Sequence, residues 1–147
     1  MGMHRRHFAA AASAAAVLVA LILGAVVPSA AGKKSIDWST DLQKAAKQAA
    51  KAKKPLMVDV YTDWCHWCKE LDKKTYTDAR VIDLSRKFVC VKVDGDKNRD
   101  FVKKYSIEGY PTIVFLSSKS KEIHRVVGYQ GPDDFLKSMK EALKKAK

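Results

Sequence analysis

The sequence predicts a small α/β domain built on one central sheet. Short apolar runs suited to strands alternate with amphipathic segments suited to helices, and two successive strands followed by a helix close the chain. The 147 residues suffice for one domain and a short extension, but not for two ordinary cores. The chain shows no internal repeat and no low-complexity segment beyond an alanine-rich leader.

The first 31 residues have the pattern of a signal peptide. Two arginines precede an uncharged stretch over 9–27, and small residues suit cleavage after Ala31. The alternative is an uncleaved membrane anchor, because the uncharged stretch nearly reaches the ~20 residues that a spanning helix needs. Alanine dominates the first half of the stretch and gains little in lipid, which favours cleavage. We therefore expect a periplasmic or secreted domain over 32–147, anchored in the membrane if the leader is retained.

The first elements after the leader are expected as a helix, a strand and a second helix. The first helix begins at Ser39 or Thr40 and ends near Lys53, before a proline. Its expected inward-facing residues are Leu42, Ala45, Ala46, Ala49 and Ala50. The apolar run over 56–61 suits a strand buried on both faces. The second helix begins at the cysteine pair and runs to about Lys74.

The remaining elements follow the same alternation and then close with a hairpin. We expect a helix over 79–86, a strand over 88–93, a turn over 94–96, a helix over 99–105, strands over 112–116 and 122–127, and a last helix from Pro132. The last helix is expected to begin there because proline is favoured in the first turn of a helix and the two aspartates that follow it favour a helix N-terminus.

The most informative motif is Trp64-Cys65-His66-Trp67-Cys68. At the start of a helix, the first sulfur lies beside unsatisfied backbone N–H groups, which favour the nucleophilic thiolate. The second sulfur lies one turn along the same face, where it can resolve a mixed disulfide. The same spacing also forms half of a zinc site. However, a ring this small joins almost nothing, so in an exported protein it indicates redox chemistry rather than a structural disulfide.

The net charge excludes fewer classes of function than the cysteine motif does. The formal net charge of +12 falls to +10 without the two leader arginines, and most of it comes from lysines spaced along amphipathic helices. Such lysines form a solvated face. No arginine-rich or aromatic-interleaved patch is present, which argues against nucleic-acid binding.

Four features together resemble the thioredoxin superfamily over about Ile36 to Lys145. They are a strand carrying Asp59, the Trp-Cys-x-x-Cys run, the Tyr110-Pro111-Thr112 run, and the closing hairpin and helix. More narrowly, these runs resemble exported thioredoxin-like proteins related to the C-terminal domain of the bacterial transmembrane thiol:disulfide interchange protein. The resemblance implies a thioredoxin fold, with a central mixed β-sheet flanked by helices.

The resemblance implies catalytic roles for Cys65, Cys68 and Asp59. Cys65 is expected as the nucleophile and the more exposed sulfur, and Cys68 as the more buried resolving thiol. Asp59 matches a buried acid, and desolvation would raise its pKa into a range useful for moving the Cys68 proton. The alternative for Asp59 is a solvated carboxylate at the end of a strand.

Five residues are expected to contact the substrate. They are Trp64, His66, Trp67, Tyr110 and Pro111. Pro111 matches the cis-proline that faces the disulfide in this family, and its backbone would pair with an extended substrate together with that of Tyr110. A protonated His66 would stabilise the Cys65 thiolate and favour an oxidant, whereas Asp59 favours a reductase. Trp67 could shield the disulfide or contact substrates. The alternative is that His66 and Trp67 simply cover the end of the helix.

Cys90 departs from the family pattern. Aligned on Asp94, it falls where many thioredoxins place a lysine near the buried acid. It is either a small buried apolar residue or a third thiol close enough to affect Asp59.

The sequence therefore predicts an exported thiol–disulfide oxidoreductase that reduces or interchanges protein disulfides. Because the dithiol is the redox centre, we expect no organic cofactor and no metal. The expected partners are proteins with cysteines or disulfides and a membrane redox protein that resets the pair, with no nucleic acid, and the chain is expected to be a monomer. The alternatives are a disulfide oxidase or isomerase, a redox-inert binding protein, or a copper or zinc module that uses the cysteine pair with His66 or His124.

Overall fold

The structure is a computed structural model that describes residues 34–147, so the predicted leader over 1–31 lies outside the described residues. The elements are β1 (Trp38–Ser39), α1 (Leu42–Ala52), β2 (Leu56–Tyr61), α2 (His66–Glu70), η1 (Leu71–Thr75), α3 (Ala79–Ser85), β3 (Val89–Asp94), α4 (Arg99–Lys104), β4 (Thr112–Leu116), β5 (Glu122–Val127) and α5 (Pro132–Lys145). Within the described part of the chain, no helix is both long and apolar enough to cross a bilayer.

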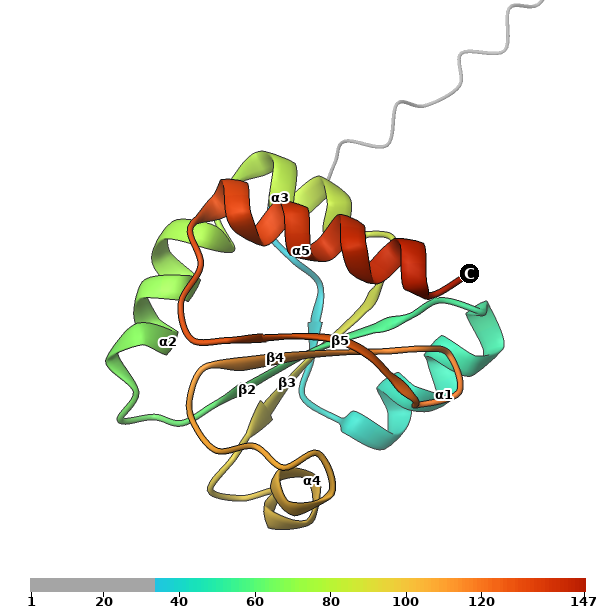
Figure 1. The fold of residues 1–147 in the computed structure, drawn as a ribbon, viewed down its shortest axis with the longest axis horizontal. Helices are drawn as coiled ribbons and strands as arrows, with labels where there is room; N and C mark the ends of the chain where they lie inside the picture. The colour runs from blue at the N-terminus through green and yellow to red at the C-terminus, as the bar shows by residue number, and fades with distance from the viewer. Residues whose placement is uncertain (1–33) are drawn as a thin grey trace, which may run out of the picture. The chain divides into compact units, whose positions relative to one another are not determined.

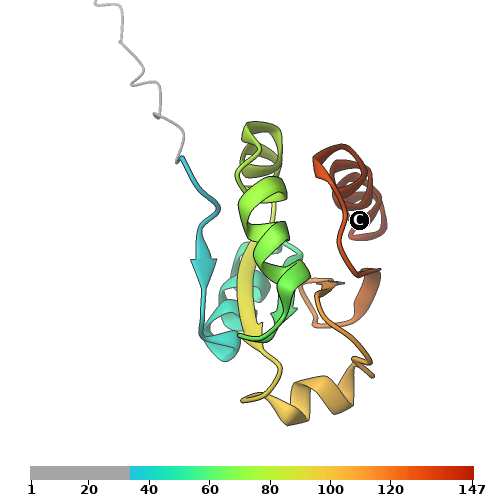
Figure 2. The same cartoon turned by 90° about the vertical axis from the view of Figure 1, so that its left-hand side faces the viewer.

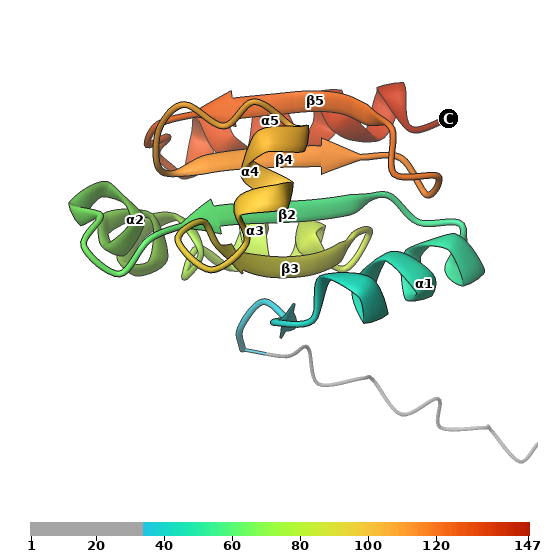
Figure 3. The same cartoon turned by 90° about the horizontal axis from the view of Figure 1, so that it is seen from below.

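The strands form one mixed sheet in the order β1-β3-β2-β4-β5. β1 and β2 lie parallel to β3 on either side of it, whereas β4 runs antiparallel to β2 and β5 antiparallel to β4 (Figure 3). The predicted central mixed sheet with flanking helices is confirmed. β4 and β5 have the predicted bounds, and β3 begins one residue later than expected.

Each face of the sheet is covered by its own helices (Figure 1). α3, α5 and η1 cover one face, where Phe135 and Met139 are fully buried against Ile113 and Phe115. α1 and α4 cover the opposite face through buried alanines and Phe101. Figure 2, turned so that the α2 side faces the viewer, shows the green α2 segment in front of the sheet, and Figure 3 shows α2 at one end of β2. The fold therefore presents the start of α2, and with it the cysteine pair, at that end of the sheet.

The first helix starts later than predicted. Ser39 pairs with Val91 in β1, a short edge strand that the sequence analysis did not predict. The helix N-cap is instead Asp41, whose carboxylate accepts the backbone N–H of Lys44 at 2.9 Å. Ala50, expected to face inward, is exposed, because the helix turns its alanines at 45 and 49 toward the sheet.

The helix that carries the cysteines is not one regular α-helix. After α2, the run continues as the π-helix η1, and the Tyr76 N–H donates to the Leu71 carbonyl at 3.0 Å. Single π turns inside helices occur frequently at functional sites. Here the π turn lies one helical turn beyond Cys68.

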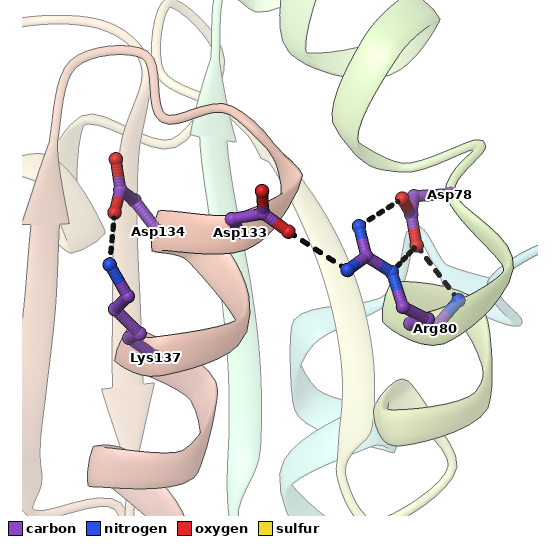
Figure 4. Close-up of polar contacts among 5 residues, drawn as sticks. All are labelled: Asp78, Arg80, Asp133, Asp134 and Lys137. Atoms are coloured by element: carbon purple, nitrogen blue, oxygen red, sulfur yellow. Dashed lines mark hydrogen bonds and ion pairs between the residues drawn. The ribbon is translucent and has the colours of Figure 1, made fainter.

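A surface ion cluster ties α3 to α5 (Figure 4). The guanidinium of Arg80 lies 2.8 Å from Asp78 at the start of α3 and 2.8 Å from Asp133 at the start of α5. Asp78 is also the N-cap of α3, since it accepts the backbone N–H of Arg80. Asp134 and Lys137 form a separate pair along α5.

Candidate active site

Cys65 and Cys68 are joined by a disulfide, with 5.3 Å between their Cα atoms. Cys65 is the N-cap of α2, and its sulfur accepts the backbone N–H of Cys68 at 3.1 Å. Donation from this N–H would stabilise a thiolate at the same sulfur once the disulfide is reduced. The site therefore has a preformed donor for a Cys65 thiolate.

The two cysteines do not differ in exposure as predicted. Each residue is 5% exposed, whereas Cys65 was expected to be the more exposed. That Cys65 carries the more exposed sulfur in the reduced protein stays a prediction.

Asp59 is buried inside β2, 1% exposed, so the alternative of a solvated strand end is wrong. Its register partner on β3 is Lys92, whose Nζ lies 3.2 Å from Asp59 Oδ2. Desolvation raises the pKa of Asp59 to about 6, although the Lys92 ammonium lowers it. A carboxyl group with this pKa changes its protonation state close to neutral pH.

Lys92 is a site residue that the sequence analysis missed. Its ammonium also contacts the half-exposed carboxylate of Asp72 on η1. Three aromatic rings surround it, with 5.4, 5.3 and 5.5 Å from Nζ to the ring centroids of Trp38, Tyr61 and Tyr76. Opposite charge and aromatic faces offset the cost of burying the ammonium. A lysine inside an otherwise apolar strand was the available signal.

Cys90 does not lie where the sequence alignment placed it. It stands opposite Met57 and Trp38, while Lys92 is the residue opposite Asp59. Counting back from Asp94 misplaced the lysine position by two residues along β3. The thiol donates to the Ser85 carbonyl at 3.6 Å, and burial raises its pKa to about 12. Cys90 is thus a buried neutral thiol.

The helical run from α2 into η1 joins the cysteine pair to the buried charges. Asp72, four residues after Cys68, meets the same ammonium that pairs with Asp59. The Tyr76 hydroxyl also lowers the pKa of Asp59, although neither that hydroxyl nor Asp59 Oδ1 makes a well-formed hydrogen bond with another described residue. Burial raises the pKa of Tyr76 well above its usual value.

Trp64 and Tyr110 line one side of the disulfide. Trp64 is 67% exposed, its indole N–H donates to Asp96 Oδ2 at 3.0 Å, and its ring meets Tyr110 edge-on at 5.8 Å. Tyr110 packs over Gly95, where an added Cβ would clash with the tyrosine ring and its hydroxyl oxygen. The Tyr110–Pro111 peptide bond is cis. Contacts between side chains thus tie together three loops beside the cysteines.

Trp67 and His66 line the other side. The Trp67 ring lies 5.6 Å from Tyr129 and 5.4 Å from His66. Tyr129 was not among the predicted site residues, because it follows β5, far from the motif in sequence. Its neighbour Gly128 donates its N–H to the Pro111 carbonyl at 2.8 Å, which brings this segment to the site.

The described residues give no support to the alternative of a metal-handling module. His124 stacks on Phe115 from the middle of β5 and does not join His66 and the cysteines. Across residues 34–147, no three His, Cys, Asp or Glu side chains are grouped so that they could hold a metal ion.

Comparisons with known proteins agree with this geometry. Residues 42–143 match the thioredoxin-like domain family. The chain is 34% identical over 109 residues to the thiol:disulfide interchange protein DsbD of Ralstonia nicotianae, an alignment that covers 71% of the chain and 18% of that protein. It is 37% identical over 92 residues to DsbD of Pectobacterium atrosepticum, covering 58% and 16%. The chain thus spans less than a fifth of the length of these curated relatives.

Two solved structures illustrate the fold that is shared. A thioredoxin from Thermus thermophilus superposes with a TM-score of 0.69 at 25% identity, covering 76% of the chain and 90% of the thioredoxin. The reduced DsbD C-terminal domain of Neisseria meningitidis superposes with a TM-score of 0.62 at 23% identity, covering 69% and 93%. Both have the sheet and helix arrangement described above.

Proposed function

The chain belongs to the thioredoxin-like domain family, and on that premise we propose that it is an exported thiol–disulfide oxidoreductase that reduces or interchanges protein disulfides. The observation that carries this proposal is the Cys65–Cys68 disulfide at the start of α2, adjoining a strand in which Asp59 is buried with a pKa of about 6. A small disulfide that only stabilised the fold would gain nothing from a buried acid.

The reaction consists of two disulfide exchanges. The Cys65 thiolate attacks one sulfur of a partner disulfide, so a Cys65–partner bond forms and the other partner sulfur leaves and takes up a proton. Cys68 then loses its proton and attacks the Cys65 sulfur. The Cys65–Cys68 disulfide forms and the second partner sulfur leaves as a thiol. Two electrons pass from the dithiol to the partner disulfide.

Asp59 is proposed to accept the Cys68 proton in the second exchange. Its raised pKa supports this role, because a base is most effective when its pKa lies near the operating pH. Lys92 contacts both Asp59 and Asp72, and Asp72 is half exposed. Lys92 and Asp72 together therefore connect the buried carboxyl group of Asp59 to the surface. We infer that Lys92 positions Asp59 and limits the rise of its pKa.

Tyr110 and Pro111 are proposed to hold the substrate backbone beside Cys65, with Trp64, His66 and Trp67 contacting its side chains. The Trp64–Tyr110 contact and the Gly128–Pro111 hydrogen bond support this assignment, because they bring the Pro111 loop to the disulfide. The aromatic rings and the loop form one surface around a disulfide in which both cysteines are buried.

Export and the redox partner complete the proposal. The leader pattern over 1–31 supports export of a domain over 32–147 that acts as a monomer in the periplasm or outside the cell. The relatives named thiol:disulfide interchange proteins are several times longer than this chain. Because an exported dithiol must be reset outside the cytosol, we propose that a membrane redox protein supplies the electrons that reduce the Cys65–Cys68 disulfide after each turnover.

The reduction potential of the Cys65–Cys68 pair tests the direction of electron flow. Equilibration against dithiothreitol or glutathione, followed by thiol trapping, is expected to give a value near that of thioredoxin, about −270 mV. A value near about −120 mV would instead identify a disulfide oxidase, with a dominant contribution from His66. Cys65→Ser is the control for the reaction itself, and it is expected to abolish reduction of protein disulfides.

A further inference from the structure

Large apolar side chains surround the disulfide and remain in solvent. Within residues 34–147, the exposed large hydrophobic side chains are Trp64, Trp67 and Val127, with 67%, 55% and 67% of their surface accessible. All three adjoin the site, because each tryptophan directly precedes one of the cysteines and Val127 pairs with Thr112, the residue after Pro111. Exposed apolar groups gathered at one place mark an interaction surface.

Trp67 and Tyr129 form one continuous part of this surface, which we call the aromatic shelf. Their ring centroids lie 5.6 Å apart with 36° between the ring planes. Trp67 comes from α2 and directly precedes Cys68, whereas Tyr129 comes from the segment after β5. The shelf therefore includes a residue of the same short helix that carries Cys68.

The segment that carries Tyr129 is fixed on both sides. Gly128 donates its N–H to the Pro111 carbonyl at 2.8 Å and has φ +85°, a conformation that favours glycine. The Gln130 carbonyl accepts the Thr75 hydroxyl of η1 at 2.6 Å. Because both neighbours are held, Tyr129 loses little conformational entropy when a ligand packs on it.

The other side of the disulfide differs in chemistry. The Trp64 indole N–H is committed to the Asp96 carboxylate at 3.0 Å, so that side combines an aromatic ring with a negative charge. Trp67 instead meets another aromatic ring. A bulky apolar side chain of a partner thus gains most on the side of the shelf, where it covers two aromatic rings in contact.

We propose that the aromatic shelf binds a bulky aliphatic or aromatic side chain that lies beside the reactive cysteine of a partner polypeptide. The inference rests on the proposed function, because disulfide exchange brings the partner sulfur to Cys65 and so places its neighbouring residues over the shelf. A small thiol such as glutathione has no bulky apolar side chain and cannot occupy the shelf. Tyr129 is thereby a specificity-determining residue.

Paired peptide substrates test this proposal. Two short peptides, identical except for leucine or serine next to their single cysteine, are each prepared as a mixed disulfide with glutathione. The full chain is reduced with dithiothreitol, freed of it and mixed with each peptide in a single turnover. Each turnover releases the peptide thiol and glutathione and oxidises Cys65 and Cys68 to the disulfide. We expect the leucine peptide to react about tenfold faster than the serine peptide, the discrimination that one apolar side chain supplies.

The preference ratio within each variant is the decisive readout, because any change in the reactivity of the dithiol cancels from it. Tyr129→Ala is expected to reduce the ratio to about twofold and Tyr129→Phe to preserve it, since phenylalanine keeps the ring. Arg80→Ala, on the remote α3 surface, is the matched control and keeps the wild-type ratio.

Two results would overturn the proposal. Equal rates for the two peptides in the wild type, or an unchanged ratio in Tyr129→Ala, would show that the shelf does not select the partner, while disulfide exchange itself would stand. Failure of the wild-type protein to reduce either peptide or glutathione disulfide would instead remove the proposed function, and the role of the shelf with it.

Discussion

Two aspartates of this protein each lie beside a cation, yet their pKa values move in opposite directions. The Arg80 hydrogen bond holds the pKa of Asp78 at about 2, whereas the pKa of Asp59 rises to about 6 although Lys92 lies 3.2 Å away. The surface pair is the shorter, at 2.8 Å. The distance to the cation therefore does not decide in which direction the pKa of the aspartate moves.

Burial decides it. The Asp59 side chain is 2% exposed and that of Lys92 19%, so the carboxylate loses hydration that a single ammonium does not replace. The Asp78 side chain is 19% exposed and that of Arg80 60%, and Asp78 also accepts the backbone N–H and two guanidinium N–H groups of Arg80, so this carboxylate is less desolvated than Asp59 and better hydrogen-bonded. The surface cluster caps α3 and ties it to α5, whereas the buried pair holds a carboxyl group ready to change its protonation state near neutral pH. The same ion-pair chemistry serves structure in one place and reactivity in the other.

The largest expected effect is the pH dependence of stability that Asp59 contributes. Because its pKa is higher in the folded than in the unfolded chain, the folded state binds the proton more tightly, and stability falls as the pH rises from about 4 through about 6. Relative to Asp59→Asn, the wild type is expected to lose about 2.5 kcal/mol of unfolding free energy between pH 4 and pH 8. Urea denaturation of both proteins across this range measures the difference, and parallel curves would contradict the raised pKa.

Removing the cation of the buried pair is expected to have the next largest effect. Lys92→Met leaves the Asp59 carboxylate without its ammonium and should cost about 2 kcal/mol of unfolding free energy at pH 8, less than for a fully buried pair because the lysine is partly exposed. The loss should shrink at pH 5, where Asp59 is protonated. Urea denaturation at the two pH values measures the loss of unfolding free energy. An equal loss at both would mean that Lys92 stabilises the fold only through the packing of its side chain.

Cys90 tests the effect of burial without charge, because it is a buried titratable residue near Asp59 and Lys92 but is neutral. Cys90→Ala is expected to cost about 1 kcal/mol of unfolding free energy through lost packing. The rate of disulfide exchange should remain at the wild-type value, because Lys92 and not Cys90 stands opposite Asp59. Exchange kinetics with glutathione disulfide provide the check, and a change in rate would revive a role for the third thiol.

The smallest expected effect belongs to the surface cluster. Arg80→Ala should change stability no more than an ordinary surface substitution, and the change should diminish as salt is added. The pKa of Asp78 should nevertheless rise from about 2 toward its ordinary value. NMR titration of the carboxyl groups in the wild type and the variant measures the pKa of Asp78. A large, salt-independent loss of stability would contradict the expected difference between the surface pair and the buried pair.

The sequence predicted most of the fold because its strands are apolar runs with clear boundaries. It predicted β4 and β5 to the residue, and it predicted the cysteine pair and the buried acid. It did not predict β1, because two residues at an edge carry no periodicity and depend on pairing with β3. Tyr129 was missed for a similar reason, since a tertiary contact alone brings it to Trp67. Lys92 carried a signal, as a lysine inside an apolar strand, but its partner Asp59 is set by the pairing of β2 with β3.

The most direct test of the central claim is the pH profile of the resolving step, in which Cys68 displaces the partner from Cys65. Mixing the reduced protein with glutathione disulfide and following the second release of glutathione isolates this step. The wild-type rate is expected to rise through a pH of about 6, where Asp59 becomes a base. Asp59→Asn should lose this inflection and react about 100-fold more slowly at pH 7. Identical profiles for the two proteins would contradict the claim that the buried carboxyl group serves the dithiol.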